Sequence, residues 1–462
     1  MNLACDIGRC QTAATRRLAQ RGAASLVVVM VLFFVMALVA AYTNRNLIFE
    51  QRTAVNQYRS TMALEAAEAG IEWALAQLNG GRIGGNCLQI GVPSPNTSFR
   101  QRYLNIDPAT GMITVPAQPG VPAQPRRAGC VWTGASWSCD CPTNNNPVLA
   151  APAGPGLFPA FWVTFSVANV ARQGNVEIIA NGCTSLNAAC LTADDKSTSD
   201  VEGFAQIHSL VALKSSLTTP PAAALTVFGQ VGLPPPVVGA PLAAYNTATD
   251  RGGITIQASG AVNSGTFTVV STPGTPSAAS IIANDASLIL PAPVGPPVIT
   301  SGDRLFASVF GAWPNTYSLQ PGAVVLNCPA AGCRQALADT VAMNPDRVIW
   351  INGDLTLESA GVVGSAPNPL NPAAAVGPAT IVTTGNLIFT APGVRIFGVV
   401  YARNGNNWTG SGEIQGAALS ESDLAPTAAL TVVYNPDVID ALRLRAGSFV
   451  KLSGGWRDFP WP

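Results

Sequence analysis

Residues 23–42 read AASLVVVMVLFFVMALVAAY, twenty consecutive residues without a charged side chain. As an α-helix this stretch would span about 30 Å, the hydrocarbon thickness of a bilayer. The segment before it is basic, with Arg9, Arg16, Arg17 and Arg21 against Asp6. Because basic residues that flank a membrane helix stay in the cytoplasm, the sequence predicts a single crossing with a cytoplasmic N-terminus and an exported body.

The helical pattern continues beyond the apolar stretch. Residues 44–79 contain no proline, and small or apolar residues recur at every seventh position. These positions are Ile48, Val55, Met62, Ala69 and Ala76. The glycine pair at 80–81 favours an end of the helix there. We therefore predict one helix over 23–79, with an apolar first half in lipid and an amphipathic second half.

Two other interpretations of the apolar stretch stay open. It is long enough for a permanent membrane anchor that is never cleaved. A secretory signal peptide cut after residues 39–41 would instead release a soluble protein that starts at Tyr42. The stretch exceeds the ~7–15 apolar residues of a usual signal peptide, and the helix pattern continues past it, which disfavours this second alternative.

The composition excludes several classes of function. Charged residues make up 11% of the 462 residues, against about 25% in an ordinary soluble protein, and 25 basic residues balance 25 acidic ones. This balance leaves no electrostatic footprint for nucleic acid. The one histidine, His208, excludes sites built on several imidazoles and is expected to be a packed or surface residue. No nucleophile elbow, Walker loop or dinucleotide fingerprint occurs, so we expect neither an enzyme nor a cofactor.

The cysteine count favours disulfides. The chain has ten cysteines, an even number that fits an exported protein in an oxidising compartment. Cys183 and Cys190 frame one short loop, which predicts a local bridge. Cys328 and Cys333 enclose four residues, which predicts a second local bridge.

Four further cysteines lie in an irregular region rich in proline and glycine. They are Cys87, Cys130, Cys139 and Cys141. One residue separates Cys139 from Cys141, which is too close for an easy mutual bridge, so each is expected to pair with Cys87 or Cys130. Binding of Zn²⁺ by the four thiolates is the alternative, and the expected compartment disfavours it.

Residues 161–167, 176–180 and 204–213 alternate apolar and smaller residues, which predicts an antiparallel three-strand meander. The loop before the third strand is acidic. Hard oxygen ligands gather there, so Asp194, Asp195 and Asp200 are weak candidates for a calcium site. The spacing lacks an EF-hand pattern, and a solvated loop is the alternative.

Residues 216–462 contain short β-runs separated by Gly, Asn, Ser and Pro. Residues 351–357 nearly repeat as 383–389, offset by 32, and Gly398-Val-Val-Tyr nearly repeats as Gly416-Ala-Ala-Leu, offset by 18. Such spacing predicts the coils of a β-solenoid, with a β-sandwich as the alternative. The aromatic tail 454–462 is expected to cover an open end of the solenoid.

Two sets of residues are candidates for carbohydrate chemistry or recognition. Asp354, Glu358, Arg395 and Arg403 are the nearest equivalents of a cleavage site, although a local role in turns is favoured for Asp354. Exposed tryptophans could bind sugars or partners, or could instead fill the core. They are Trp132, Trp137, Trp408, Trp456 and Trp461.

The N-terminal residues carry a resemblance to a known family. A short basic leader ends at Gly22, the apolar helix follows at once, and Ala-Glu-Ala-Gly occupies 67–70. The motif QRGAASLVVVMVLFF…LEAAEAGIEWAL over residues 20–78 resembles the N-terminal module of type IV pilins, specifically PilX-type minor pilins and pilus-assembly proteins. The resemblance implies cleavage by a prepilin peptidase between Gly22 and Ala23, with methylation, and packing of the helix among other pilins.

One position departs from the major pilins of this family. They carry a glutamate at the fifth mature residue, where this chain has Val27. Its absence resembles minor pilins at a filament tip, which have no subunit above them. Residues 348–445 also look similar to the β-helical or bactofilin-like C-terminal parts of PilX-type proteins.

These observations predict an α+β region followed by a mostly β region, in four segments. They are a prepilin-type leader at 1–22, a transmembrane and amphipathic helix at 23–79, a pilin-like antiparallel domain with Cys-rich loops at 80–215, and a solenoid-like domain at 216–462.

The predicted function is that of a minor pilin or pilus-assembly protein at or near a filament tip, structural and also adhesive. Its route would run from the bacterial inner membrane to the pilus. A membrane-anchored envelope scaffold or adhesin that is never cleaved is the alternative, and a secreted carbohydrate-active enzyme is a third.

Overall fold

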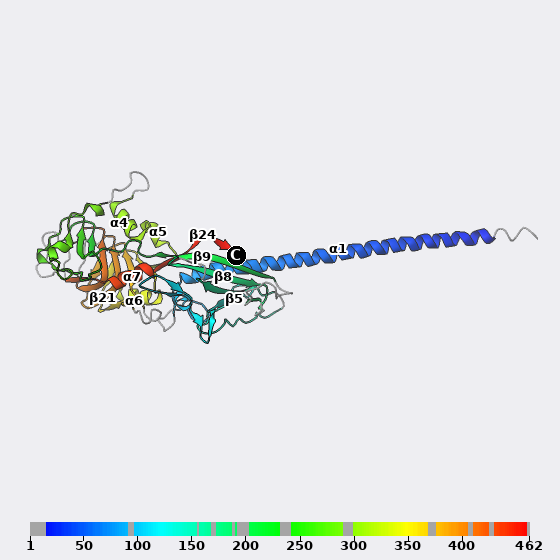
Figure 1. Cartoon of the computed structure of the whole chain (residues 1–462), viewed down its shortest axis with the longest axis horizontal. Helices are drawn as coiled ribbons and strands as arrows, with labels where there is room; N and C mark the ends of the chain where they lie inside the picture. Colours follow the sequence, from blue (N-terminus) through cyan, green and yellow to red (C-terminus); the bar gives the residue numbers. More distant parts are fainter. Residues whose placement is uncertain are drawn as a thin grey trace, which may run out of the picture. The chain divides into compact units, whose positions relative to one another are not determined.

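The computed structural model describes residues 15–90, 97–154, 157–167, 172–186, 190–191, 203–231, 242–289, 299–367, 376–404, 410–424 and 429–459. The chain divides into two compact units, Met1–Met62 and Ala63–Pro462, and each is described by itself. Helix α1, Thr15–Leu78, begins in the first unit and ends in the second (Figure 1).

Helix α1 ends where the glycine pair predicts. Its last residue is Leu78, and Asn79 follows as a buried polar residue. The Asn79 amide nitrogen donates to Leu75 O at 3.1 Å, which satisfies one of the carbonyls left open at a helix end. The same nitrogen donates to Phe449 O at 2.9 Å, and Asn79 Oδ1 accepts from Phe449 N at 2.7 Å. The helix end is thus joined to the last strand of the chain.

The second unit contains an antiparallel sheet of six strands in the order β24-β9-β8-β7-β5-β6. The strands are β5 Ala128–Trp132, β6 Trp137–Asp140, β7 Ala160–Ser166, β8 Asn175–Cys183, β9 Phe204–Ser215 and β24 Gly447–Arg457. Short elements precede them: α2 Phe99–Tyr103, β1 Asn105–Ile106, β2 Ile113–Thr114, β3 Ala117–Gln118 and β4 Val121–Pro125. Strands β7, β8 and β9 pair consecutively, as the meander prediction requires.

One face of this sheet packs on the last turns of α1. Val163, Ile178 and Val211 share a buried cluster with Ile71 and Ala74 of the helix. These sheet residues alternate along their strands with residues of the opposite face, as a strand period of two requires.

Strand β24 differs from its sequence-based prediction. It pairs antiparallel with β9, from Gly447 opposite Ser215 to Arg457 opposite His208. Residues 454–457 are therefore part of this sheet and do not cover an open end of the repeat region. Phe449 explains the difference, because its buried ring belongs to the same core as the end of α1.

The remaining strands of the second unit pair in parallel. A twelve-strand sheet follows the path β13-β11-β23-β22-β21-β19-β16-β15, with β10, β12, β14 and β18 beside it, and β17 pairs β20 separately. The first group is β10 Ala223–Val227, β11 Ala243–Tyr245, β12 Ile254–Ala258, β13 Thr268–Val270 and β14 Ile281–Ile282. The second is β15 Ala323–Leu326, β16 Val348–Ile351, β17 Leu355–Leu357, β18 Gly361–Val363, β19 Ala379–Thr383, β20 Leu387–Phe389, β21 Val394–Ala402, β22 Gly412–Ser420 and β23 Leu430–Tyr434.

The near-repeats of the sequence are neighbours in this sheet. Ile351 lies opposite Thr383, and Gly398 lies opposite Gly416, so both offsets are registers of parallel pairing. Gly416 has a φ of +144°, and a Cβ there would lie 2.1 Å from Gly398 O. The glycine is needed because only a residue without a Cβ allows this approach of two strands.

The order of the strands is not sequential. β10 pairs with β22, and β11 pairs with β23, so the run 223–282 stacks beside the end of the run 323–434. The chain enters the sheet at β10, which pairs with β22, and one branch continues from β10 through β12 to β14. The chain later resumes at the edge strand β15 and returns through β16, β19 and β21 to β22.

Helices cover this parallel region. They are α4 Ser301–Phe310, α5 Pro314–Ser318, α6 Arg334–Met343 and α7 Pro436–Leu444 (Figure 1). Helix α4 starts with a capping box between Thr300 and Asp303. Its Phe306 ring lies 5.1 Å from Tyr401 of β21, so α4 is packed directly on the sheet.

Candidate assembly site

The described part of the apolar stretch is exposed along its whole length. Residues 24–42 form continuous α-helix, and their large side chains are half or more exposed, as with Leu26 at 62% and Phe33 at 71%. Within the described residues, one helix is long and apolar enough to cross a membrane, Ala24–Leu78. Burial of each such side chain is worth about 1.5–3 kcal/mol, so the stretch requires lipid or other helices around it.

The predicted processing site lies at the start of this helix. Gly22 and Ala23 belong to the helical backbone of α1, and the description of side chains begins at Ala24. Cleavage between the two residues stays a prediction. Val27, which replaces the glutamate of major pilins, is 58% exposed.

The next part of the helix keeps exposed apolar residues although it lies beyond the apolar stretch. Leu47, Ile48, Phe49, Val55 and Tyr58 are between 47% and 60% exposed. Polar side chains such as Arg45 and Glu50 alternate with them. This composition suits contact with other amphipathic helices better than water.

The last part of the helix packs on the sheet through small residues. They are Ala63, Ala66, Ala67, Gly70 and Ala74. On the sheet side, a Cβ at Gly182 would lie 2.2 Å from Ala63 O, and a Cβ at Gly70 would lie 3.0 Å from the Phe161 ring. The helix backbone therefore lies directly on β7 and β8, which fixes the point where the helix leaves the sheet.

The second unit contains four disulfides. They join Cys87 to Cys141, Cys130 to Cys139, Cys183 to Cys190, and Cys328 to Cys333. The last two are the local bridges that the spacing predicts. The first two use all four cysteines of the irregular region, so these thiols hold no zinc in this form. Cys87 and Cys141 are both buried in the core beside α1.

The candidate carbohydrate residues do not converge. Asp354 accepts from Asn386 N at 2.7 Å, and Glu358 accepts from Arg334 N at 3.0 Å at the start of α6. That backbone bond lowers the pKa of Glu358. Arg395 pairs with Glu413 on the neighbouring strand at 2.8 Å. Each side chain is thus occupied by a local contact, in agreement with the structural interpretation of the sequence.

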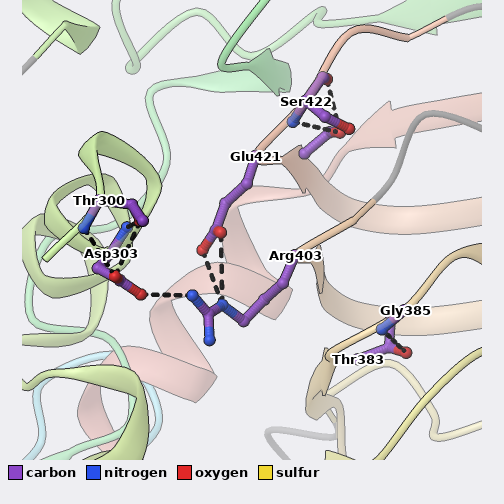
Figure 2. Close-up of polar contacts among 8 residues, drawn as sticks. Thr300, Asp303, Thr383, Gly385, Arg403, Glu421 and Ser422 are labelled. Carbon is purple, nitrogen blue, oxygen red and sulfur yellow. Dashed lines mark hydrogen bonds and ion pairs between the residues drawn. The ribbon is translucent and has the colours of Figure 1, made fainter. Parts of the chain in front are cut away.

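Arg403 belongs to a cluster that sequence analysis did not find. Its guanidinium contacts Asp303 at the start of α4, and its Nε donates to Glu421 at 3.1 Å (Figure 2). Burial raises the pKa of Glu421 although Arg403 opposes this effect. Burial acts in the same direction on Asp303, but bonds from Thr300 and Arg403 outweigh it and lower the pKa. The cluster anchors α4 to the sheet.

His208 lies inside the antiparallel sheet. Its Nδ1 is 3.2 Å from Glu177 Oε1 of β8 and 3.2 Å from the Arg457 guanidinium of β24. All three side chains are buried. His208 is therefore a packed residue, as expected. Glu177 comes from the preceding strand, whereas Arg457 comes from a strand 249 residues away.

Some residues of the other predicted sites lie outside the described residues. The calcium candidates Asp194, Asp195 and Asp200 lie outside the described residues, as do Trp408 and Trp461. Trp132 and Trp137 face each other across the β5–β6 hairpin with ring centroids 5.5 Å apart, and Trp456 is 51% exposed. Over the part of the chain that is described, no group of three or more His, Cys, Asp or Glu side chains could hold a metal ion.

Comparison with known proteins finds a family match over the exposed helix. Residues 21–72 match the family model described as PilX N-terminal. A crystal structure of the competence-associated pilin ComZ from Thermus thermophilus is similar at 12% identity, covering 86% of this chain and 97% of that chain, with a TM-score of 0.22. No curated protein matches the chain. The family match supports a pilin-like N-terminal region and a role related to type IV pili.

Proposed function

We propose that this protein is a minor pilin or pilus-assembly protein of a type IV pilus or related filament. The proposal depends on two properties of one helix. Residues 24–42 form an exposed apolar helix, and the same residues lie inside the match to the PilX N-terminal family. Such a helix is stable in a bilayer before assembly and among neighbouring helices after it.

The proposed route starts in the bacterial inner membrane. The basic segment 1–22 is the leader on the cytoplasmic side, a prepilin peptidase cuts between Gly22 and Ala23, and the body is exported. The four disulfides support an oxidising compartment for the body. Val27 supports a position at or near the filament tip, where the glutamate of major pilins has no partner.

The body is proposed to consist of two regions. Residues 80–215, completed by β24, form the pilin-like antiparallel domain that holds the helix. Residues 216–446 form a solenoid-like stack, which the parallel registers and their offsets support. This stack would be the surface that a tip subunit presents outward, with adhesion as its role.

The first experiment measures the mature N-terminus by intact-mass analysis, in cells with and without prepilin peptidase. A start at Ala23 that disappears without the peptidase is expected. A Gly22→Arg variant serves as the matched control and should retain Met1 in both strains. Retention of Met1 in the wild type would support the uncleaved envelope scaffold instead, and a start at Tyr42 would support a secreted protein.

The second experiment separates filament assembly from simple membrane anchoring. Filaments sheared from cells should contain the protein, detected by an antibody against the body. Immunogold labelling at filament ends is the expected pattern for a tip subunit. A protein found only in the membrane fraction after correct cleavage would contradict the proposal.

A further inference from the structure

A small cavity lies beside the contacts that join α2 to the rest of the body. The Arg100 guanidinium of α2 donates from Nε to Leu78 O, at the end of α1, at 3.1 Å, and from Nη1 to Asp346 O at 3.4 Å. Asp346 lies between α6 and β16. The cavity has a volume of about 20 Å³ and is lined by residues 100–101 and 104–106 together with Asp346 and Arg445. Residues of the antiparallel region and of the parallel region therefore share one cavity.

One side chain that lines this cavity has a buried donor without a partner. Gln101 Oε1 accepts from Ser98 N at 3.2 Å in the capping box of α2. This bond determines which end of the amide is the nitrogen. Gln101 Nε2 is buried, and no group among the described residues accepts from it.

Another side chain that lines the cavity has a buried acceptor without a partner. Asp346 is 7% exposed, and its Oδ1 lies 3.0 Å from Arg445 Nε. No described residue donates to its Oδ2. The backbone of Asp346 has a φ of +64°, and its carbonyl accepts from Arg100 Nη1 and, at 3.0 Å, from Gly447 N. These bonds hold the residue at the cavity.

The two groups require a partner that is both donor and acceptor. Buried polar groups in folded proteins are hydrogen-bonded, because an unpaired one loses its hydration without compensation. A cation at this site would be repelled by the guanidinium groups of Arg100 and Arg445, and an anion would be repelled by the Asp346 carboxylate. A small neutral molecule that accepts from Gln101 and donates to Asp346 satisfies both.

The volume of the cavity selects water among such molecules. One water needs about 10–15 Å³ of cavity volume, so about 20 Å³ holds one water and no larger molecule. A second cavity against Asp346 has a volume of about 10 Å³, at the lower limit for a water, and Gln101 does not line it. The cavity that Gln101 and Asp346 share is therefore the one that serves both groups.

We propose that this cavity is a binding site for one structural water, which accepts a hydrogen bond from Gln101 Nε2 and donates one to Asp346 Oδ2. The water joins α2 to the segment that precedes β16. It lies beside the bonds of Arg100 to Leu78 and Asp346, so it completes the junction between the end of α1, the antiparallel region and the parallel region. This inference does not depend on the proposed role in a pilus.

X-ray hydroxyl-radical labelling of the full chain in detergent micelles tests the site. Radicals formed from a bound water oxidise the side chains around it, including those that bulk water does not reach. Ile106 lines the cavity and is 5% exposed, whereas Ile113, its partner in the β1–β2 pair, is 4% exposed and does not line it. Ile106 should be oxidised about threefold faster than Ile113, since one of two equally buried isoleucines adjoins the water. Equal rates would overturn the proposal.

A pair of variants separates a bound water from entry of bulk solvent. Gln101→Met removes the donor and keeps the length of the side chain, so oxidation of Ile106 should slow to the rate of Ile113. Ser98→Ala is the matched control, because it removes the hydroxyl that accepts from Gln101 N and leaves the bond from Ser98 N to Gln101 Oε1 in place. It should keep the fast rate at Ile106. A fast rate in Gln101→Met would mean that bulk solvent reaches the cavity, which contradicts a bound water.

A second measurement does not depend on a variant. A crystal structure of the full chain in detergent, at a resolution that shows ordered waters, should contain one density peak about 2.7–3.2 Å from both Gln101 Nε2 and Asp346 Oδ2. The absence of this peak would overturn the proposal. A direct hydrogen bond between the Gln101 amide and the Asp346 carboxylate would overturn it as well.

Discussion

Two buried glutamates show how neighbouring groups decide whether a charge stabilises this fold. At Glu177 burial raises the pKa, but bonds from His208 and Arg457 outweigh it and lower the pKa overall. At Glu421 burial raises the pKa in spite of Arg403, because this one arginine also serves Asp303. The ionised form is therefore favourable at the first position and costly at the second.

The substitution Glu177→Gln should destabilise the protein by about 1–3 kcal/mol at pH 7, because it replaces a buried charged acceptor of the Arg457 guanidinium by a neutral one. The matched variant Glu421→Gln should be tolerated, since Arg403 keeps Asp303. Thermal unfolding of the full chain in detergent measures both. Equal losses of stability in the two variants would show that the partners do not decide the outcome.

The pH dependence of stability follows with opposite signs. The contribution of Glu177 is present above the unfolded pKa of a glutamate and is lost as the pH falls through its lowered folded pKa. The contribution of Glu421 is present below the unfolded pKa and is lost as the pH rises through its raised folded pKa. Comparing unfolding temperatures of each Gln variant with wild type between pH 3 and pH 8 should show the two differences moving in opposite directions.

At the scale of single residues, the sequence predicts few of the contacts between side chains. Local pairs such as Cys183–Cys190 follow from spacing alone, since few residues separate the partners. The contact of His208 with Arg457 joins positions 249 residues apart. It depends on which strand becomes the neighbour of β9, and no pattern within β9 contains that information.

Among the elements, the contact between α1 and the sheet is the closest. Gly182→Ala would place a Cβ 2.2 Å from Ala63 O and separate the helix from β8, at a cost of about 1–3 kcal/mol. Gly85→Ala is the matched control, because its added Cβ would meet nothing within 4 Å. Differential scanning fluorimetry compares the two, and an unchanged midpoint in Gly182→Ala would contradict the close packing.

The disulfides differ in how much chain they close. Cys87 and Cys141 are 54 residues apart, whereas Cys328 and Cys333 are five apart. In the chain-entropy model, replacing the first pair by serines should cost about 2 kcal/mol more than replacing the second. Unfolding midpoints of the two double variants provide the test. A larger loss for the short loop would mean that local packing, and not loop closure, dominates.

Element prediction succeeded where the pattern is periodic. The long helix, the meander and the 32- and 18-residue offsets are each visible as a repeat in the sequence, and the structure contains the corresponding helix, pairings and registers. The tail at 454–462 was predicted to cover an open end, because its aromatic residues do not reveal which sheet they join. Strand β24 pairs with β9 through the buried Phe449.

For the whole molecule, the proposed role depends on the exposed helix. Val55→Asp places a charge in the region that would contact neighbouring helices, where Val55 is 47% exposed in the single chain. We expect normal folding of the body but at least a tenfold loss of the protein from sheared filaments, since an unpaired buried charge is strongly unfavourable. Gln57→Asp, at an exposed polar position nearby, is the control. Equal incorporation of both variants would exclude this face as a contact.

The path of the chain through the parallel region was beyond sequence analysis. Offsets reveal which segments stack when their sequences nearly repeat in register. Strands β10 and β22 both contain Ala-Ala-Leu, but they pair one residue out of that register, with Leu225 opposite Ala418. This pairing joins two runs of strands that are distant in the sequence, 223–282 and 323–434. It depends on all the buried side chains between the two runs.

The junction between Asn79 and Phe449 has a mechanical consequence. The Asn79 amide pairs with both backbone groups of Phe449, and Arg100 donates to Leu78 O and to Gly447 O. Tension along the helix is therefore shared with residues 447–451 of the terminal strand, which pair with β9 in one continuous register. Helix α1 and strand β24 therefore bear load together, which suits the proposed role of a subunit that is pulled through its helix.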